Sequence, residues 1–213
     1  MKTTAIFCLL ALCATTASAQ TSGFYGGASI GQARVDMDNS SDDSAKLATE
    51  LGFTNISSSQ DDSDTSWKIF AGYKLNQNLA IEGGYADLGK FQLNADGILN
   101  GVTGKLDGSV KSHAYFIDLL GVLPMGDFSV FGKLGGAYTQ TKAEASASYS
   151  SASASDSVKE NKLSPKLGVG VEYNITQSIA IRGEFERYFN VGDDSTTGES
   201  DVDVWSVGLK ASF

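Results

Sequence analysis

Charged residues recur at every second position in short segments whose intervening positions are mostly apolar or small. Glu82 lies between Ile81 and Gly83, and Glu184 lies between Gly183 and Phe185. Side chains two residues apart point to the same side of a β-strand, so this spacing collects carboxylates and ammonium groups on one face. Such a set forms a salt-bridge network if it is enclosed, or a narrow ion path if it is hydrated. Nine residues share this placement: Lys68, Glu82, Asp118, Lys133, Glu172, Arg182, Glu184, Glu186 and Lys210.

The residue types give little indication of a catalytic site. His113 is the only histidine, and the neighbouring Ser112 would point to the opposite face of a strand. Nucleophilic catalysis needs a nucleophile, a base and an orienting acid within reach of one another. We therefore expect a rim histidine without chemistry, no catalytic residue and no enzyme activity.

The elements that carry these charges are short segments with a period of two, rich in glycine, aromatic and β-branched residues. Their connections are alternately long and polar or very short, which gives three short connections on one side and four long ones on the other. This rhythm is typical of an all-β, eight-stranded, antiparallel, up-and-down barrel. The eight expected strands cover residues 24–35, 65–75, 79–91, 108–123, 128–141, 163–173, 179–190 and 202–213.

The first nineteen residues have the pattern of a secretory signal peptide. Lys2 supplies the positive start, an apolar run follows, and Ala17-Ser18-Ala19 provides small residues for cleavage before Gln20. Both cysteines, Cys8 and Cys13, lie inside this segment, so the expected mature domain, residues 20–213, has no disulfide and no thiolate metal site. No later stretch reaches the roughly 18 apolar residues of a membrane helix, so any membrane crossing must use strands.

Two kinds of eight-stranded barrel fit the alternation, and the charges distinguish them. A soluble, lipocalin-like barrel buries its apolar face inward, whereas a transmembrane barrel turns that face to lipid and edges it with aromatic residues. Aromatic residues from so many strands would overfill one small interior, so we expect a transmembrane barrel whose inward set is glycine, alanine, serine and a few charges. The expected lipid-facing aromatics are Phe24, Trp67, Tyr73, Tyr85, Tyr115, Tyr138, Tyr173, Phe185 and Trp205.

Net charge and the long connections restrict the binding partners. The chain carries a formal net charge of −9, and loss of Lys2 with the signal makes it more acidic, which argues against nucleic acid. Residues 36–64 contain eight acids and one lysine. The Asp36-x-Asp38 start of a calcium loop is not followed by the glycine and glutamate that such a loop needs, so no metal or cofactor is expected. The low-complexity residues 143–157 either extend two strands beyond the membrane or stay flexible.

The residues carry a resemblance to the membrane-domain family of outer-membrane protein A and its small eight-stranded relatives. The segment from Phe24 to Gly31 looks like the family's first strand, and the segment from Gly72 to Tyr85 resembles its second hairpin. The terminal alternation that closes on Phe213 looks like the signal recognised for barrel assembly. The resemblance implies an outer-membrane protein with a salt-bridged interior. The chain stops at Phe213 without a peptidoglycan-binding domain, so a role in tethering the cell wall is not expected.

Two function classes remain open. The first is a structural or surface-interaction barrel that contacts an extracellular ligand through residues 36–64 and 143–160. The second is a narrow, porin-like channel. Five acids facing four bases favour an interlocked plug over an ion path, since a channel would show a ring of like charge along an open bore. We expect a monomer whose partners are outer-membrane lipids, the barrel-assembly machinery and that ligand.

Overall fold

The computed structural model describes residues 23–35, 54–61, 63–99, 102–149, 152–193 and 198–213. The expected signal peptide, with its cleavage site, and the Asp36-x-Asp38 pattern lie outside these residues. The described residues form nine strands: β1 (Gly23–Val35), β2 (Thr54–Asp61), β3 (Ser63–Lys74), β4 (Leu79–Leu99), β5 (Val102–Met125), β6 (Phe128–Tyr149), β7 (Ala152–Asn174), β8 (Ile179–Asp193) and β9 (Gly198–Ser212). Among these residues no helix is long and apolar enough to cross a membrane.

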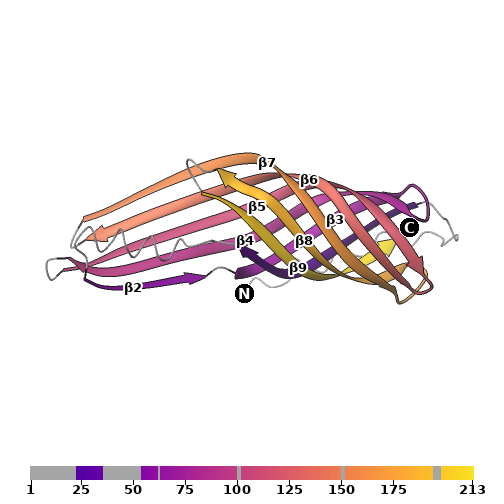
Figure 1. The fold of residues 1–213 in the computed structure, drawn as a ribbon, viewed down its shortest axis with the longest axis horizontal. Coiled ribbons are helices and arrows are strands. Elements are labelled where there is room, and N and C mark those ends of the chain that lie inside the picture. Colours follow the sequence, from indigo (N-terminus) through magenta and orange to yellow (C-terminus); the bar gives the residue numbers. More distant parts are fainter. Residues whose placement is uncertain (1–22, 36–53, 62, 100–101, 150–151, 194–197) are drawn as a thin grey trace, which may run out of the picture.

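Eight of the strands close into a barrel (Figure 1). All neighbours pair antiparallel in the ring order β1, β3, β4, β5, β6, β7, β8, β9, and the β1–β9 pairing completes the circle. This confirms the predicted all-β, eight-stranded, up-and-down barrel. Closure leaves no unpaired strand edge in the barrel, which is the condition for a sheet to cross a bilayer.

Tight turns at one end hold the hairpins in register. The carboxamide oxygen of Asn76 accepts hydrogen bonds from the backbone N–H groups of Asn78 and Leu79, at 2.8 and 2.9 Å. In the β7–β8 turn the hydroxyl of Thr176 accepts the corresponding bonds from Ser178 and Ile179. Gly126 takes a φ of 72° in the β5–β6 turn, a value that suits glycine. In transmembrane barrels of bacteria the short turns mark the periplasmic end, so the end with the short turns is called the periplasmic end and the opposite end the outer end.

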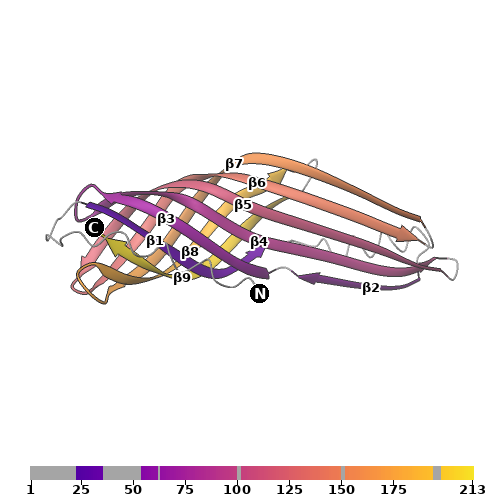
Figure 2. The same cartoon turned by 180° about the vertical axis from the view of Figure 1, so that it is seen from behind.

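The long connections are largely strands. For residues 143–157 this is one of the two alternatives expected from the sequence, whereas strand structure between residues 92 and 107 is not expected from it. Both β4–β5 and β6–β7 continue far beyond the barrel, so residues 143–149 and 152–157 extend the sheet (Figures 1 and 2). Residues 54–61, expected within a loop, form β2, which pairs with β4 from Gln92 to Ile98. β4 pairs with β3 only up to Asp87, and its outer part, from Gln92 onward, pairs with β2 instead. The result is a protruding sheet made by β2 and the outer halves of β4 to β7.

The two faces of the barrel have opposite chemistry. Large apolar side chains are exposed on the outer face of every barrel strand, with Ile117 65 % and Leu209 57 % exposed. An apolar band of this extent is the surface that lipid covers. The inner face differs from the expected set of glycine, alanine, serine and charges, because it also holds bulky rings. These inward aromatic residues are Tyr25, Phe70, Phe91, Phe116, Phe131 and Tyr188.

Candidate functional site: the charged lumen

All nine sequence-predicted lumen charges lie inside the barrel, where each is at most 6 % exposed. They come from β3 to β9, and the structure adds Lys166 from β7, which is fully buried. The predicted set did not include Lys166, although the period of two places it on the same face of β7 as Glu172. With it, the buried charged side chains among the described residues are five acids and five bases. This buried set is therefore electrically balanced, which lowers the cost of enclosing so many charges.

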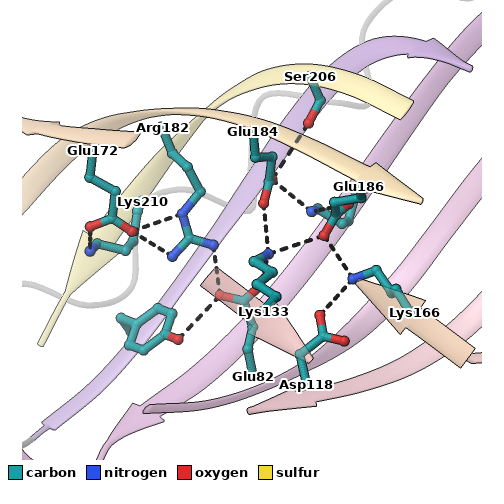
Figure 3. A network of polar contacts seen from close by, with 12 residues as sticks. Glu82, Asp118, Lys133, Lys166, Glu172, Arg182, Glu184, Glu186, Ser206 and Lys210 are labelled. Atoms are coloured by element: carbon teal, nitrogen blue, oxygen red, sulfur yellow. Dashed lines mark hydrogen bonds and ion pairs between the residues drawn. The ribbon is translucent and has the colours of Figure 1, made fainter. Parts of the chain in front are cut away.

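Lys133 of β6 joins most of the acids at the centre of the lumen (Figure 3). Its Nζ is 2.7 Å from Glu82 Oε1, 2.6 Å from Glu184 Oε2 and 3.2 Å from Glu186 Oε1. Lys68 reaches the same two β8 glutamates from β3, at 2.6 Å and 2.8 Å. Each ammonium group thus donates to carboxylates from other strands. The central cluster ties β3, β4, β6 and β8 together.

Arg182 of β8 extends the network toward the periplasmic end. Its Nη1 donates to Glu82 Oε2 at 2.6 Å, and its Nε and Nη2 donate to Glu172 Oε1 at 2.9 and 2.6 Å. Lys210 of β9 also donates to Glu172, on its other oxygen. The hydroxyl of Tyr25, from β1, donates to Glu82 Oε2 at 3.1 Å. Planar guanidinium groups suit such multiple carboxylate contacts, and Arg182 uses three of its donors here.

Lys166 and Asp118 complete the network toward the outer end. Lys166 Nζ is 2.5 Å from Asp118 Oδ2 and 2.7 Å from Glu186 Oε1. Asp118 and Glu82 are direct cross-strand partners on β5 and β4. Like charges opposite each other on one face are destabilising. Lys133 from the adjacent strand β6 and Lys166 from the next strand β7 supply the compensation. Every one of the eight barrel strands contributes at least one member to the connected set.

Aromatic rings fill the lumen space between the ion pairs. The guanidinium carbon of Arg182 lies 4.5 Å from the Phe70 ring centroid and 4.9 Å from that of Phe131. Lys166 Nζ lies 4.1 Å from the centroid of Phe116. These distances favour cation–π attraction in a site from which water is displaced.

Inward glycines make room for these rings. Gly84 is the direct partner of Phe116, and a Cβ on Gly84 would come within 2.8 Å of the Phe116 ring. Gly170 is the direct partner of Phe131, and a Cβ on Gly170 would come within 2.3 Å of the Phe131 ring. Pairs of glycine and an aromatic residue at facing inward positions are the sequence signal from which the inward rings could have been predicted.

Little open space remains around the network. A cavity of about 380 Å³ opens at the periplasmic end, where Lys74, Arg182 and Lys210 line it. On the outer side, the cavity beside Lys68 and Glu186 measures only about 10 Å³, hardly enough for one water molecule. The packed charges and rings lie between the two cavities. Charged and aromatic side chains therefore fill most of the described lumen between them.

Comparison with known proteins agrees with this architecture. Residues 19–213 match the model of the OmpA-like transmembrane domain. The chain belongs to this family. Outer membrane protein A of Salmonella typhi is 27 % identical over 219 residues, which cover all of this chain and 56 % of the relative. Outer membrane protein A of Klebsiella pneumoniae is 28 % identical over 165 residues, or 76 % of this chain and 45 % of the relative. The chain spans about half the length of these relatives.

Solved structures share the fold. Ail of Yersinia pestis has a TM-score of 0.50 at 21 % identity, with 90 % of this chain and 99 % of Ail covered. OprG of Pseudomonas aeruginosa has a TM-score of 0.50 at 16 % identity, with 90 % of this chain and 96 % of OprG covered. The predicted localisation is therefore confirmed: this OmpA-like barrel is a bacterial outer-membrane protein.

The predicted lipid-facing aromatics lie on the outer face of the OmpA-like barrel, near its two ends. Close to the periplasmic turns, the ring of Phe24 contacts that of Tyr73 in a tilted arrangement, with 4.8 Å between centroids. Toward the outer end, Tyr85 contacts both Trp67 and Tyr115, and Phe185 contacts Trp205. Tyr85 and Phe185 are half-buried because these neighbours cover them. The other seven are between 39 % and 68 % exposed, and they are Phe24, Trp67, Tyr73, Tyr115, Tyr138, Tyr173 and Trp205.

His113 and Ser112 of the OmpA-like barrel point to opposite faces. The Nε2 of His113 makes a 2.9 Å hydrogen bond with Gln140 Oε1 on the outer face. The hydroxyl of Ser112 is buried in the lumen, 3.0 Å from that of Thr141. The two groups that a hydrolytic mechanism would combine are therefore separated by the sheet.

The backbone N–H of Phe213 donates to the carbonyl of Phe24, so the chain end is tied to the first strand. Its role as an assembly signal stays a prediction.

Proposed function

We propose that this protein is a structural and surface-interaction barrel, which braces the outer membrane and presents its protruding sheet and acidic loops to an extracellular ligand. The balanced, interlocked lumen carries the proposal, because it gives the barrel cross-strand bracing and leaves little room for solute passage.

The bracing follows from the connectivity of the ion pairs. Glu82 bonds to Arg182 and Lys133 at once, and Glu186 bonds to Lys68, Lys133 and Lys166. A carboxylate held by two or three cations from other strands resists the separation of any one strand. Removal of one partner would leave an uncompensated buried charge, which is strongly destabilising.

The surface role draws on the length of four strands. β4 to β7 contain 21 to 24 residues each, whereas a tilted membrane strand needs about 9–11. The surplus lies at the outer end, where a scaffold of this type presents recognition elements. Residues 36–64, which contain eight acids, follow the outer end of β1 in the sequence, and we propose that their charge selects a cationic partner.

We further propose that the protein is not an enzyme. His113 has an amide partner, and no group of three or more histidine, cysteine, aspartate or glutamate residues suited to a metal ion is present within the described ranges. Hydrolysis needs a base and an acid that orients it, and these described residues do not provide that pair.

A narrow channel is the alternative, and conductance separates the two. Residues 20–213 are refolded into a planar lipid bilayer, with insertion verified by the heat-dependent gel mobility of the barrel. We expect a quiet membrane under applied voltage. Steady, ion-selective openings that vanish in Glu82→Gln or Lys133→Gln would overturn the plug and assign a channel.

The surface role is tested with a trimmed barrel. Leu93 pairs directly with Gly108, and Glu144 pairs directly with Ser157, so residues 94–107 and 145–156 can each be replaced by an Asn-Gly turn. Cells lacking the gene are complemented with the wild-type or the trimmed barrel. Trimming removes the protruding sheet but keeps the acids of residues 36–64, so a second variant carries amides in place of the seven acids from Asp36 to Asp62. The amide variant should lose adhesion to polycation-coated surfaces, and both variants should keep wild-type detergent resistance. Wild-type adhesion in the cells that carry the amide variant would refute the surface role. Detergent resistance that is the same in uncomplemented cells as in cells with the wild-type barrel would refute the bracing role.

A further inference from the structure

Four lysines form a row across the outer face of the sheet, at the base of its protruding part. Lys90 of β4 pairs directly with Lys111 of β5, Lys111 pairs with Lys142 of β6, and Lys142 pairs with Lys159 of β7. Lys90, Lys111 and Lys159 are exposed, and Lys142 is half-buried. Neighbouring strands are about 4.8 Å apart, so the four Cα atoms span roughly 14 Å. We call these residues the lysine row.

The lysine row is only partly neutralised by the protein. Lys111 lies 3.4 Å from Asp87, and Lys142 contacts Glu144. Lys90 and Lys159 have no ion pair with any described residue. Like charges at directly opposed positions are unfavourable, so four consecutive lysines leave a local positive excess in a chain whose net charge is −9. An external anion would remove this repulsion.

The row lies just beyond an aromatic layer on the same face. Tyr85, Tyr115 and Tyr138 are themselves direct cross-strand partners on β4, β5 and β6. On β5 and β6 the lysine follows the tyrosine by four residues toward the outer end, a distance of about 13 Å along a strand and less along the membrane normal because strands tilt. Tyrosines mark the edge of the hydrocarbon, so the ammonium groups reach the headgroup layer.

The opposite side of the barrel provides a contrast. There Phe185 and Trp205 form the aromatic layer, and the next outward-facing pair is Arg187 with Asp203. The Nη2 of Arg187 lies 2.5 Å from Asp203 Oδ2. The two charges neutralise each other, so this pair needs no external anion.

We propose that the lysine row binds the phosphate groups of lipids in the outer leaflet of the membrane. One phosphate bridges two neighbouring ammonium groups, and the acyl chains lie against the tyrosines below. The lysine row lies at the level of the lipid headgroups, which favours a lipid as the ligand. A site for a soluble polyanion would be more accessible near the tip of the protruding sheet. The proposal concerns the outer face alone and stands whether or not the lumen conducts.

The two tryptophans, Trp67 and Trp205, report on the two sides of the barrel. Trp67 on β3 is the direct partner of Asp87, next to the row, and Trp205 lies on the contrasting side. Trp205→Phe and Trp67→Phe each leave one reporter. The refolded single-tryptophan barrels are placed in phosphatidylcholine vesicles that contain brominated-chain phosphatidic acid or brominated-chain phosphatidylcholine. Quenching of each tryptophan then measures which lipid is enriched beside it.

We expect phosphatidic acid to quench Trp67 several-fold more strongly than phosphatidylcholine does, and Trp205 to show little preference. Replacement of the four lysines by glutamine should abolish the preference at Trp67, whereas replacement by arginine should keep it. Lys74→Gln with Lys105→Gln, which removes charge outside the row, should change nothing. Added inorganic phosphate should compete poorly, because it lacks the acyl chains.

Three results would overturn the proposal. The first is an equal preference at both tryptophans in the wild-type lysine background. The second is a preference at Trp67 that survives the glutamine substitutions. The third is lysine-dependent binding of a sulfated polysaccharide by the detergent-solubilised barrel with no lipid preference, which would assign the row to an extracellular polyanion instead.

Discussion

At the residue scale, the lumen depends on reciprocal ion pairing. Glu82 and Arg182 show this most clearly, because both are almost completely buried and each has at least two charged partners. A buried ion pair contributes little over an apolar pair of the same volume, but a buried charge without its partner is costly. The network therefore makes single substitutions far more damaging than its net contribution suggests.

Arg182→Ala is expected to destabilise the barrel by about 3–5 kcal/mol, because Glu82 loses one of its cations and Glu172 keeps only Lys210. Glu82→Ala should cost a similar amount. The double variant should cost less than the two single losses combined, since contacting residues couple. Urea unfolding in lipid vesicles measures these energies, with the exposed Glu144→Ala as the control. Wild-type stability in both single variants would contradict a structural network.

Gly170→Ala is expected to cost about 1–3 kcal/mol through overpacking. The added Cβ would lie 2.3 Å from the Phe131 ring and 2.7 Å from the carbonyl oxygen of Gly183. Gly121→Ala is the matched control, because no atom lies within 4 Å of the Cβ that it adds on the outer face. The two variants are compared by the urea concentration at the midpoint of unfolding. Equal midpoints would show that the Phe131 ring moves aside for the added methyl group without loss of stability.

At the element scale, two irregularities mark where the barrel ends and the protruding structure begins. β4 shifts register between Asp87 and Lys90, and β8 does so between Tyr188 and Val191. At the first of these, Gly89 takes a φ of 91°, and Asp64 Oδ2 accepts the backbone N–H of Lys90 at 2.7 Å. Bulges bend a strand and increase its twist. Here the bulge in β4 coincides with the change of partner from β3 to β2.

Gly89→Ala is expected to destabilise this junction. An alanine at that φ costs roughly 1–2 kcal/mol, and its Cβ would lie 2.8 Å from the Cβ of Asp64. Amide hydrogen exchange should accelerate in β2 and in β4 beyond Gln92, while the barrel half of β4 stays protected. Uniform acceleration along β4 would mean that the bulge supports the barrel itself.

At the scale of the whole molecule, the barrel and the protruding sheet have separate sources of stability. The barrel is closed by hydrogen bonds and braced by the lumen charges. The outer parts of β4 to β7 depend on hairpin pairing with one another and with β2.

The trimmed barrel described above should therefore refold in lipid with the heat-dependent gel mobility of the folded state, and its urea midpoint should stay within experimental error of the wild-type value. A large drop in the midpoint would show that the protruding sheet is part of the cooperative unit. Wild-type protein comprising residues 20–213, refolded in the same vesicles, is the reference.

The sequence by itself determined the eight barrel strands, their antiparallel order and the face on which each residue lies, because strand parity is a local property with a period of two. Tertiary structure alone decided which charges pair. Glu82 and Arg182 are 100 residues apart, and they meet because of the curvature and stagger of the closed sheet, which no local pattern encodes. The same holds for the pairing of Lys166 with Asp118 and Glu186, and for β2, whose pairing depends on where β3 leaves β4.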